Sequence, residues 1–543
     1  MGKPQDIIDR DREWRALEKS WHRKRPELLF VLGRRRIGKS HILSRFASSV
    51  GGIYYQATRR TEAEQIAGLA RRLTAHFEDQ ALSSATFLTW EALFHYLTRK
   101  IGSSRFLLVI DEFPYLAESA PGLTSIIQRY WDHEWQSSNL RLVLCGSYIT
   151  AMQQLEALDQ PLFGRRTGKL HFRPFIAGDT AGFTPSWEAR DRLRLFGILG
   201  NLPGNLALVD DAASLGENVA ELVLDPQGRL VDEAQHILDA FTPHADVHYA
   251  LLEVIANGDR TWSGLTSRIG KSGGALSRPL AWLEQMDVIE RVVPITEKNP
   301  ARSKRAVYRI ADPYIEFWHG LVAPLLRSGT IGLTDPHEIW REVVEPKLDN
   351  YMGRVFEQVC RDWVAAGDIP FVPVRVGSWW DARSTNEVDV VSVSASGELF
   401  AGECKWGTVT GGDLDKLRQR SRLVATELGA GRVHLGLFSG NGEADAAVQE
   451  AAMVLLDQPP HRRIADRLCR RAAGRAHQGG RSAAGPAAPA QLPDRVLARG
   501  RPRLLHDALL GAARRQAEAG EGAVRARAGA VREPGGRARG VPH

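Results

Sequence analysis

The stretch "ELLFVLGRRRIGKSHILSRF", residues 27–46, joins an apolar strand to an amphipathic helix through a glycine-rich loop. Its centre, "GRRRIGKS" at 33–40, matches the pattern G-x-x-x-x-G-K-[ST], and a strand before it and a helix after it give the context that the pattern needs. In such a loop the glycines let backbone N–H groups approach phosphates at a helix N-terminus. The stretch therefore predicts a phosphate-binding loop in a sheet covered by helices.

Individual residues of this loop have distinct expected roles. Lys39 would neutralise the β- and γ-phosphates of ATP, and Ser40 would hold Mg²⁺. With a serine and an arginine further along the chain, the residues expected to contact the nucleotide are Gly33, Arg36, Ile37, Gly38, Lys39, Ser40, Ser147 and Arg165. A glycine-rich loop can also be a simple turn, but the flanking strand and helix favour the nucleotide.

A second motif, "FLLVIDEF" at 106–113, is an apolar strand that ends in two acids. Ligands of open α/β sheets bind at the carboxyl ends of the strands, which places Asp111 and Glu112 beside the loop. Asp111 would support Mg²⁺ together with Ser40, and Glu112 would polarise the water that attacks the γ-phosphate. The alternative role for these acids is capping of a helix N-terminus.

Two later segments supply the remaining candidates for the nucleotide site. "LRLVLCGSY", 140–148, is typical of a strand that ends in Ser147, which would contact the γ-phosphate or the water. "PLFGRRTGK", 161–169, places Arg165 and Arg166 after a glycine, and either could reach a phosphate of the same chain or of a neighbouring copy as an arginine finger. A solvated run of charge is an equally good interpretation of these arginines.

Changes in pattern divide the chain into five parts. Alternating strands and helices over the first 170 residues predict an α/β domain with a parallel sheet. Glycine and proline residues in "GNLPGNL" interrupt a mostly helical part, which we interpret as a lid. Three helical patterns followed by a predicted β-hairpin then have the order of a winged helix. The predicted boundaries are 1–180 for the P-loop domain, 181–240 for the lid, 241–325 for the winged helix, 326–458 for a second α/β domain and 459–543 for a tail.

The predicted winged helix has features of a DNA-binding module. Apolar positions recur at helical spacing and should face a core, namely Leu276, Leu280 and Leu283. Basic residues fall on polar positions near the helix that would enter a major groove, namely Arg268, Lys271 and Arg278. The loop "EKNPARSKR", 297–305, supplies a basic wing. Contact with DNA and packing or signalling within the chain are equally supported.

The stretch "ELFAGECKWG", 398–407, is an apolar strand that finishes on charged residues. Side chains alternate between the two faces of a strand, so Glu403 and Lys405 point the same way across Cys404. A buried strand that ends in a carboxylate and an ammonium on one face indicates a site rather than a simple core element.

The preceding strand "NEVDVVSV", 386–393, pairs naturally with this one through the turn "SASGE". That hairpin sets Asp389 opposite Glu403 and Glu387 opposite Lys405. Facing carboxylates repel unless something positive lies between them, and a divalent metal would serve. The alternative without a functional site is a surface ion pair between Glu387 and Lys405, with Asp389 turned to solvent.

A third acid, Glu357, comes from the earlier helix "YMGRVFEQVC", 351–360. Glu357, Asp389, Glu403 and Lys405 occur in the order of a PD-(D/E)xK nuclease, in which acids hold Mg²⁺ or Mn²⁺ and the lysine orients or activates the attacking water. Asp389 and Glu403 would be the metal ligands. "VDVV" stands where the name of that motif has Pro-Asp.

Composition places the chain among soluble multidomain proteins. A length of 543 residues suggests three or four domains, and no apolar run approaches the roughly 18 residues of a membrane helix. The charged N-terminus lacks the apolar centre of a signal peptide, so we expect a cytoplasmic protein with no membrane contact. The four cysteines are Cys145, Cys360, Cys404 and Cys469. They lie far apart without a CxxC pair, which argues against a zinc site and against a disulfide framework.

The net charge of +7 comes from the tail. Residues 461–543 contain 18 Arg, no Lys and 6 acids, so the tail carries +12 and residues 1–460 carry −5. The tail also lacks aromatic residues and cannot bury enough apolar surface to fold. It is either a basic disordered arm for nucleic acid or the frameshifted translation of a GC-rich gene, and we favour the frameshift.

The motifs together resemble one known family, the archaeal-type P-loop ATPases of the AAA/STAND-like kind. The resemblance covers about residues 5–457, through "GRRRIGKS", "VIDEFPYL", "CGSY", "PLFGRR", "YRIADPYIEFW" and the closing segment, while "GNLPGNL" departs from the usual Gly-Gly-hydrophobic-Pro pattern. It implies ATP binding and hydrolysis, a winged-helix domain and a C-terminal domain similar to PD-(D/E)xK nucleases.

Two functions fit this organisation. In the first, an ATPase controls a winged-helix and metal-dependent nuclease output on DNA or another nucleic acid, alone or as a homo-oligomer. In the second, the protein is an ATP-dependent switch whose nuclease-like domain only binds partners.

Overall fold

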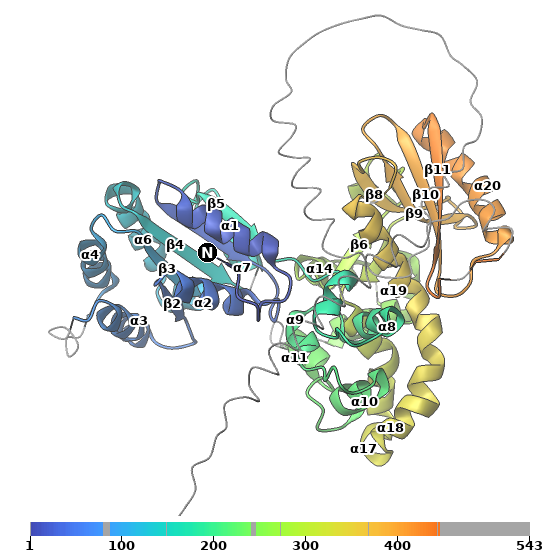
Figure 1. Ribbon diagram of the computed structural model, residues 1–543, viewed down its shortest axis with the longest axis horizontal. Helices are drawn as coiled ribbons and strands as arrows, with labels where there is room; N and C mark the ends of the chain where they lie inside the picture. The colour runs from blue at the N-terminus through green and yellow to red at the C-terminus, as the bar shows by residue number, and fades with distance from the viewer. Residues whose placement is uncertain are drawn as a thin grey trace, which may run out of the picture.

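The computed structural model describes residues 2–79, 87–147, 149–239, 246–271, 273–367, 369–442 and 444–445. The predicted tail, 459–543, lies outside these residues. Figure 1 shows a first body formed by the N-terminal sheet and its helices, and a second body that ends in the C-terminal sheet. Among the helices of the described ranges, none combines the length and the apolar character needed to cross a membrane.

The first body is a sheet of parallel strands in the order β2-β3-β4-β1-β5. Its strands are β1 (Glu27–Leu32), β2 (Ile53–Gln56), β3 (Phe106–Asp111), β4 (Leu140–Gly146) and β5 (Gly168–His171). Side chains of β1, β3 and β4 are buried along their whole length, as expected for central strands covered on both faces. The predicted α/β class with a parallel sheet is confirmed.

Helices cover both faces of this sheet (Figure 1). They are α1 (Asp11–His22), α2 (Lys39–Ser49), α3 (Glu62–His76), α4 (Trp90–Ile101), α5 (Phe113–Ser119), α6 (Leu123–His133), a 3₁₀ turn (Trp135–Ser137) and α7 (Ile149–Gln154). One core joins the sheet to α1 and α2, and another joins it to α3, α4 and α6. Helix α3 begins at a capping box in which Thr61 and Glu64 satisfy each other's backbone N–H groups.

A helical part begins the second body (Figure 1). It contains a 3₁₀ turn (Ala177–Gly182), α8 (Ala189–Leu199), α9 (Pro203–Leu206), α10 (Leu215–Val219), a π-helical turn (Ala220–Leu224) and α11 (Glu233–Asp239). The loop between α8 and α9 turns at Gly200, whose φ of 80° favours glycine, and an added Cβ there would meet Asp312 Oδ1 at 2.4 Å. This close approach brings a later segment of the chain against the lid.

Three helices and a two-stranded antiparallel sheet follow, which we term the α12–β7 unit: α12 (Asp246–Ala256), α13 (Trp262–Ile269), α14 (Gly273–Gln285), β6 (Ile289–Val292) and β7 (Val307–Ile310). The three leucines of α14 that were expected to face a core are buried, and the basic residues on the same segment are exposed. The loop between β6 and β7 lies against the C-terminal sheet, where Ile295 N donates to Ser378 O at 2.9 Å and Arg305 Nη1 donates to Trp380 O at 3.3 Å.

The remaining elements lead to the C-terminal sheet. They are α15 (Pro313–Phe317), a π-helical turn (Trp318–Val322), α16 (Ala323–Arg327), α17 (Thr330–Leu333), α18 (Pro336–Ile339), a second π-helical turn (Trp340–Val344) and α19 (Glu345–Ala366). The sheet has the order β11-β10-β9-β8, with β8 (Arg375–Trp380), β9 (Glu387–Val393), β10 (Glu398–Lys405), α20 (Gly411–Leu428) and β11 (Arg432–Ser439). Strands β8, β9 and β10 pair antiparallel, whereas β11 pairs parallel with β10 after the α20 crossover.

One continuous hydrophobic core runs through the second body. It contains buried side chains from Phe175, just before the lid, to Phe438 in β11, and includes the α12–β7 unit and α19. The other face of the C-terminal sheet has a separate core with α20. The predicted lid, winged helix and second α/β domain therefore share apolar packing across their expected boundaries.

Candidate nucleotide site and acidic site

The glycines of the loop at 33–40 are required by backbone geometry. Gly33 has a φ of 153°, and an added Cβ would meet Phe172 O at 2.9 Å. Gly38 has a φ of 91°, in the left-handed region that favours glycine, and it immediately precedes α2. The loop thus passes closely over its neighbours and leads from β1 directly into the N-terminus of α2, the order of strand, loop and helix that was predicted.

The Lys39 ammonium is buried at the centre of this loop. It donates to Gly33 O at 2.7 Å, to Arg34 O at 2.9 Å and to Ser147 Oγ at 3.0 Å. Burial lowers the pKa of Lys39, and nearby acids oppose the shift. A cation held by carbonyls inside a glycine-rich loop is suited to exchange these partners for phosphate oxygens.

The predicted metal-binding pair is in direct contact. Ser40 Oγ donates to Asp111 Oδ2 at 2.5 Å, and the Asp111 side chain is fully buried at the end of β3. Hydroxyl and carboxylate oxygens are the hard donors that Mg²⁺ takes in proteins, so Ser40 and Asp111 fit a Mg²⁺ that is completed by phosphates and water. The Tyr54 hydroxyl also donates to Asp111 Oδ2, at 2.6 Å, and burial and the Asp111 carboxylate raise the Tyr54 pKa well above its ordinary value.

Glu112 takes an unusual backbone conformation beside this pair. Its φ of 52° and ψ of 41° are left-handed, which costs a non-glycine residue roughly 1–2 kcal/mol, and such strain concentrates at functional sites. The Glu112 carboxylate accepts from Ser147 Oγ at 2.6 Å and from Ser147 N at 3.3 Å. Ser147 thus joins Glu112 to Lys39, and its contact with the phosphate or the water stays a prediction.

Two other residues of the loop have side chains that are engaged within the protein. The Ile37 side chain is completely buried in the core of the first body, so only its backbone can face a ligand. The Arg36 guanidinium lies 2.8 Å from Glu233 Oε2 at the start of α11, which directs it to the lid, and its contact with the nucleotide stays a prediction. Hydrophobic packing and a lid carboxylate explain these positions.

The lid and a later helix contact the loop directly. Gly204 N donates to Arg36 O at 3.3 Å, and Pro203 lies over Gly38, so "GNLPGNL" packs on the phosphate-binding loop. Arg34 Nη2 lies 3.1 Å from Asp312 Oδ2, and both side chains are buried. Burial raises the pKa of Asp312, and Arg34 opposes that shift.

The two arginines considered as arginine fingers, Arg165 and Arg166, pair with acids of the same chain. Arg165 forms a fork with Asp132 of α6, with Nε at 2.9 Å and 3.0 Å from the two carboxylate oxygens and Nη2 at 2.8 Å from one of them. Arg165 Nη1 also donates to Pro161 O and Phe163 O, and Arg166 pairs with Glu156. Both arginines therefore secure the loop before β5, a structural role that neither of our two interpretations included.

The register of the C-terminal hairpin is the one predicted from the turn. Leu399 pairs with Val393 and Gly402 with Val390, and continuing this ladder sets Asp389 opposite Glu403. The ladder ends there because the Asp389 side chain takes over a backbone bond, with Cys404 N donating to Asp389 Oδ2 at 2.7 Å.

Cations neutralise Glu403 in this structure. Lys405 Nζ lies 2.9 Å from Glu403 Oε1, and Arg420 Nη1 lies 3.4 Å from Glu403 Oε2. Glu403 and Lys405 thus share a face as predicted, and the lysine pairs with Glu403 in place of the alternative partner Glu387. Burial lowers the pKa of Lys405, but the ion pair with Glu403 outweighs it and the net shift is upward, so Lys405 stays protonated.

Asp389 is partly buried and has the carboxylates of other acids nearby. Burial, and then the charges of Glu357 and Glu403, raise its pKa to about 8. Glu357 lies on α19 and accepts from Arg361 Nη1 at 3.5 Å, and the same nitrogen donates to Asp389 O at 3.3 Å. We term Glu357, Asp389, Glu403 and Lys405 the acidic site.

No group of three His, Cys, Asp or Glu side chains within the described ranges is arranged to hold a metal ion. Asp389 and Glu403 remain the two candidate ligands. Mg²⁺ commonly takes only one or two protein carboxylates and keeps water and substrate phosphate as its other ligands. A pair of carboxylates, one of which has a pKa raised by burial and then by neighbouring negative charges, fits such an ion.

The raised pKa predicts a pH-dependent stability that Asp389→Asn should remove. The pKa of an aspartate in an unfolded chain is about 3.9. The free energy of unfolding that the protonated Asp389 contributes is thus fully present below that pH, and it is lost as the pH rises through about 8. In EDTA, the melting temperature of Asp389→Asn should exceed that of the wild type by a margin that grows from pH 5 to pH 8, at about 2–4 °C for each kcal/mol.

Asp415→Asn, an exposed site on α20, is the matched control and should show no such trend. An equal difference between Asp389→Asn and the wild type at both pH values would contradict the assignment.

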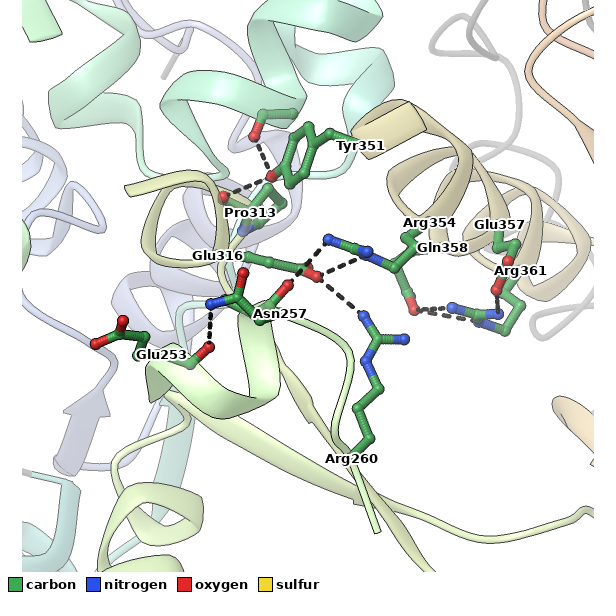
Figure 2. Close-up of polar contacts among 12 residues, drawn as sticks. Glu253, Asn257, Arg260, Pro313, Glu316, Tyr351, Arg354, Glu357, Gln358 and Arg361 are labelled. Atoms are coloured by element: carbon green, nitrogen blue, oxygen red, sulfur yellow. Dashed lines mark hydrogen bonds and ion pairs between the residues drawn. The ribbon is translucent and has the colours of Figure 1, made fainter. Parts of the chain in front are cut away.

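Polar contacts connect α19, the helix that carries Glu357, to the α12–β7 unit and to α15, as Figure 2 shows. Glu316 of α15 accepts from Arg260 at 3.0 Å and from Arg354 of α19 at 3.1 Å. Tyr351 of α19 donates its hydroxyl to Pro313 O at 2.8 Å or to Gly197 O at 2.7 Å. Helix α15 thus lies between the loop, which it meets at Asp312, and the helix that carries Glu357.

Several of these residues were not found from the sequence. Tyr54 stands in "GGIYYQA", where period-two alternation identifies a strand but not the partner of a hydroxyl. Asp312 and Glu316 stand in "YRIADPYIEFW", where the Asp-Pro pair is a helix-start signal that we did not use. The Arg34–Asp312 pair joins residues far apart in sequence, and no local pattern indicates it.

Two protein-family models match parts of this chain. Residues 7–198 match a family model described as an ATPase domain predominantly from Archaea. Residues 318–417 match a second model, described as Archaea bacterial proteins of unknown function. The chain thus has an ATPase domain of the archaeal P-loop type, followed by a C-terminal domain shared with proteins whose function is not known.

An uncharacterized protein of Methanocaldococcus jannaschii is 26% identical over 432 residues, which are 78% of this chain and 93% of the relative. Among solved structures, the Walker-type ATPase of Pyrococcus abyssi is 21% identical, covers 58% of this chain and 97% of its own, and has a TM-score of 0.46. The Aeropyrum pernix ORC2 protein, in ADPNP–ADP complexes, is 13% identical, covers 61% and 96%, and has a TM-score of 0.38.

Proposed function

We propose that this protein hydrolyses ATP at the loop formed by residues 33–40 and that its nucleotide state controls metal-dependent cleavage of nucleic acid at the acidic site. The observation that carries this proposal is the position of α15. One end of that helix contacts the phosphate-binding loop through Asp312, and the other end contacts α19 through Glu316.

Hydrolysis needs a general base and a metal, and the end of β3 and the start of α2 supply candidate residues for both. Ser40 and Asp111 would hold Mg²⁺, which would neutralise negative charge on the phosphates during hydrolysis. Glu112 accepts the proton of the attacking water once its carboxylate leaves Ser147. Lys39 exchanges Gly33 O and Arg34 O for phosphate oxygens.

The Arg34–Asp312 pair would link the binding of nucleotide to the position of α15. ATP phosphates offer Arg34 a second anionic partner close to the first. If Arg34 turned to the phosphates, Asp312 would be left as a buried unpaired carboxylate, at a cost of about 3–5 kcal/mol. Asp312 must then take up a proton or move with α15, so the position of the helix depends on the nucleotide.

The movement is passed on through Glu316. Its carboxylate joins Arg260 of the α12–β7 unit to Arg354 of α19 (Figure 2). Glu357 follows Arg354 by three residues on the same helix and faces Asp389 closely enough to raise its pKa. A shift of α15 would therefore change the spacing of the acids.

At the acidic site, Asp389 and Glu403 are suited to hold one Mg²⁺ or Mn²⁺, which would polarise the phosphodiester. Lys405 is protonated, so it orients the attacking water and stabilises negative charge and does not act as a base. The α12–β7 unit, which we interpret as a winged helix, presents exposed Lys271 and Arg278 to nucleic acid, while its wing contacts the C-terminal sheet.

The experiment that tests the coupling compares cleavage of plasmid and single-stranded DNA in Mg²⁺ or Mn²⁺, with and without ATP, for Glu316→Gln and the wild type. We expect Glu316→Gln to retain ATP hydrolysis and basal cleavage and to lose most of the effect of ATP on cleavage, about fivefold or more for a typical coupling energy. The measured quantity is the ratio of cleavage rates with and without ATP.

Glu253→Gln is the matched control because Glu253 forms an ion pair with Arg327 at 2.6 Å, on the same unit but away from α19. A wild-type ratio in Glu316→Gln would exclude α15 as the connection. If the wild type cuts no DNA or RNA with any metal, the second candidate function holds, an ATP-dependent switch with a binding domain. The cations already paired with Glu403 favour that candidate.

A further inference from the structure

The Asp111 carboxylate is shared by two hydroxyl groups. Ser40 Oγ and Tyr54 Oη both donate to Asp111 Oδ2, at 2.5 Å and 2.6 Å, and Glu112 N donates to the other oxygen, Oδ1, at 2.9 Å. Three donors therefore fix the plane of a carboxylate that is completely buried. Only Tyr54 among these donors comes from outside the phosphate-binding loop and the Asp111–Glu112 motif.

The sheet explains why Tyr54 can reach this position. Strand β2 pairs in parallel with β3, with Gln56 opposite Asp111 and Tyr54 opposite Val109. Tyr54 thus lies on the same face of the sheet as Asp111 and is its diagonal neighbour, a separation that a long aromatic side chain spans. The next residue, Tyr55, points to the other face, where its hydroxyl donates to Gln65 Oε1 at 2.7 Å.

We propose that Tyr54 is a positioning residue for the Mg²⁺ of the nucleotide site. The inference rests on the proposed Mg²⁺-binding roles of Ser40 and Asp111. When a metal takes the Ser40 oxygen as a ligand, the Ser40 proton must still point to Asp111, and this requires the carboxylate to stay in its present plane. The Tyr54 hydroxyl holds that plane from strand β2, outside the loop.

The alternative is that Tyr54 contributes only packing and a buried hydrogen bond. Metal affinity separates the two roles. Removing an outer partner of a metal-binding group typically weakens metal affinity by about 10–100-fold, whereas loss of packing changes stability without changing the dependence on metal.

The test measures binding of a fluorescent ATP analogue to the full chain during titration with Mg²⁺, and in EDTA. For Tyr54→Phe we expect the half-saturating Mg²⁺ concentration to rise about tenfold or more, with binding in EDTA unchanged. Tyr55→Phe is the matched control, since it removes the same atom from the neighbouring residue on the opposite face, and it should titrate as the wild type does. The melting temperature of each variant reports whether the fold is retained.

Ser40→Ala separates failure of this inference from failure of the proposed site. If Ser40→Ala shifts the Mg²⁺ dependence and Tyr54→Phe does not, Tyr54 has no positioning role. If neither variant shifts it, the assignment of Mg²⁺ to Ser40 and Asp111 is itself overturned. A shift of equal size in Tyr54→Phe and Tyr55→Phe would show a general effect of strand β2 and would also reject the proposal.

Discussion

Glu112→Gln is expected to bind ATP as the wild type does and to hydrolyse it at least about 10²-fold more slowly, the usual scale for loss of a general base. Glutamine keeps the size of the side chain and can still accept from Ser147, so the strained turn after β3 is preserved. It cannot take a proton from water. Single-turnover hydrolysis of ATP, measured beside equilibrium binding, gives both quantities.

Two further variants complete this experiment. Glu118→Gln changes an exposed acid on α5, the helix that begins just after Glu112, and should leave hydrolysis unchanged. Lys39→Ala should abolish nucleotide binding, because it removes the cation at the centre of the loop. Normal turnover in Glu112→Gln would remove Glu112 from the role of base, and retention of tight ATP binding in Lys39→Ala would question the loop itself.

Asp389→Ala is expected to lower metal-dependent cleavage of DNA by roughly 10³-fold while ATP hydrolysis survives. The size follows from the several kcal/mol that a bound metal contributes to the transition state, with each 1.36 kcal/mol worth about tenfold in rate. Glu403→Ala removes the second ligand and should act similarly. Cleavage of a labelled oligonucleotide across a range of Mg²⁺ and Mn²⁺ concentrations measures the loss.

Lys405→Ala should also lose cleavage, but for another reason. Its ammonium lies 2.9 Å from Glu403 and stays protonated, so its loss removes a charge that orients water and leaves metal binding in place. Lys416→Ala on α20, an exposed lysine of the same domain, is the control and should cleave normally. If Asp389→Ala and Lys416→Ala cleave alike, the acidic site is not where cleavage occurs.

Local patterns were enough to predict the phosphate-binding loop and the hairpin register. The loop has fixed spacing because glycines and a lysine must meet phosphates at a helix N-terminus, and every part of it lies within a few residues. The register of β9 and β10 follows from the turn, since alternation and a two-strand ladder leave one pairing for each residue. Both are short-range consequences of backbone geometry.

Side-chain partners were not predictable in the same way. Arg165 binds Asp132, and Arg34 binds Asp312, and in each pair the partner comes from a separate element of the fold. A guanidinium looks the same in sequence whether it faces a phosphate, a carboxylate or solvent. Tyr54 was missed for a related reason, because alternation marks it as a strand residue and says nothing about the hydroxyl.

The core that runs from Phe175 to Phe438 ties the second body into one cooperative unit. One face of the C-terminal sheet is apolar at Phe400 and Phe438, and α19 and the rest of that core cover it. Separated from the preceding helices, the sheet would expose this face and tend to aggregate. Gene rearrangements that exchange the output domain alone would thus yield insoluble chains, so the lid, the α12–β7 unit and the acidic site should be inherited together as one piece.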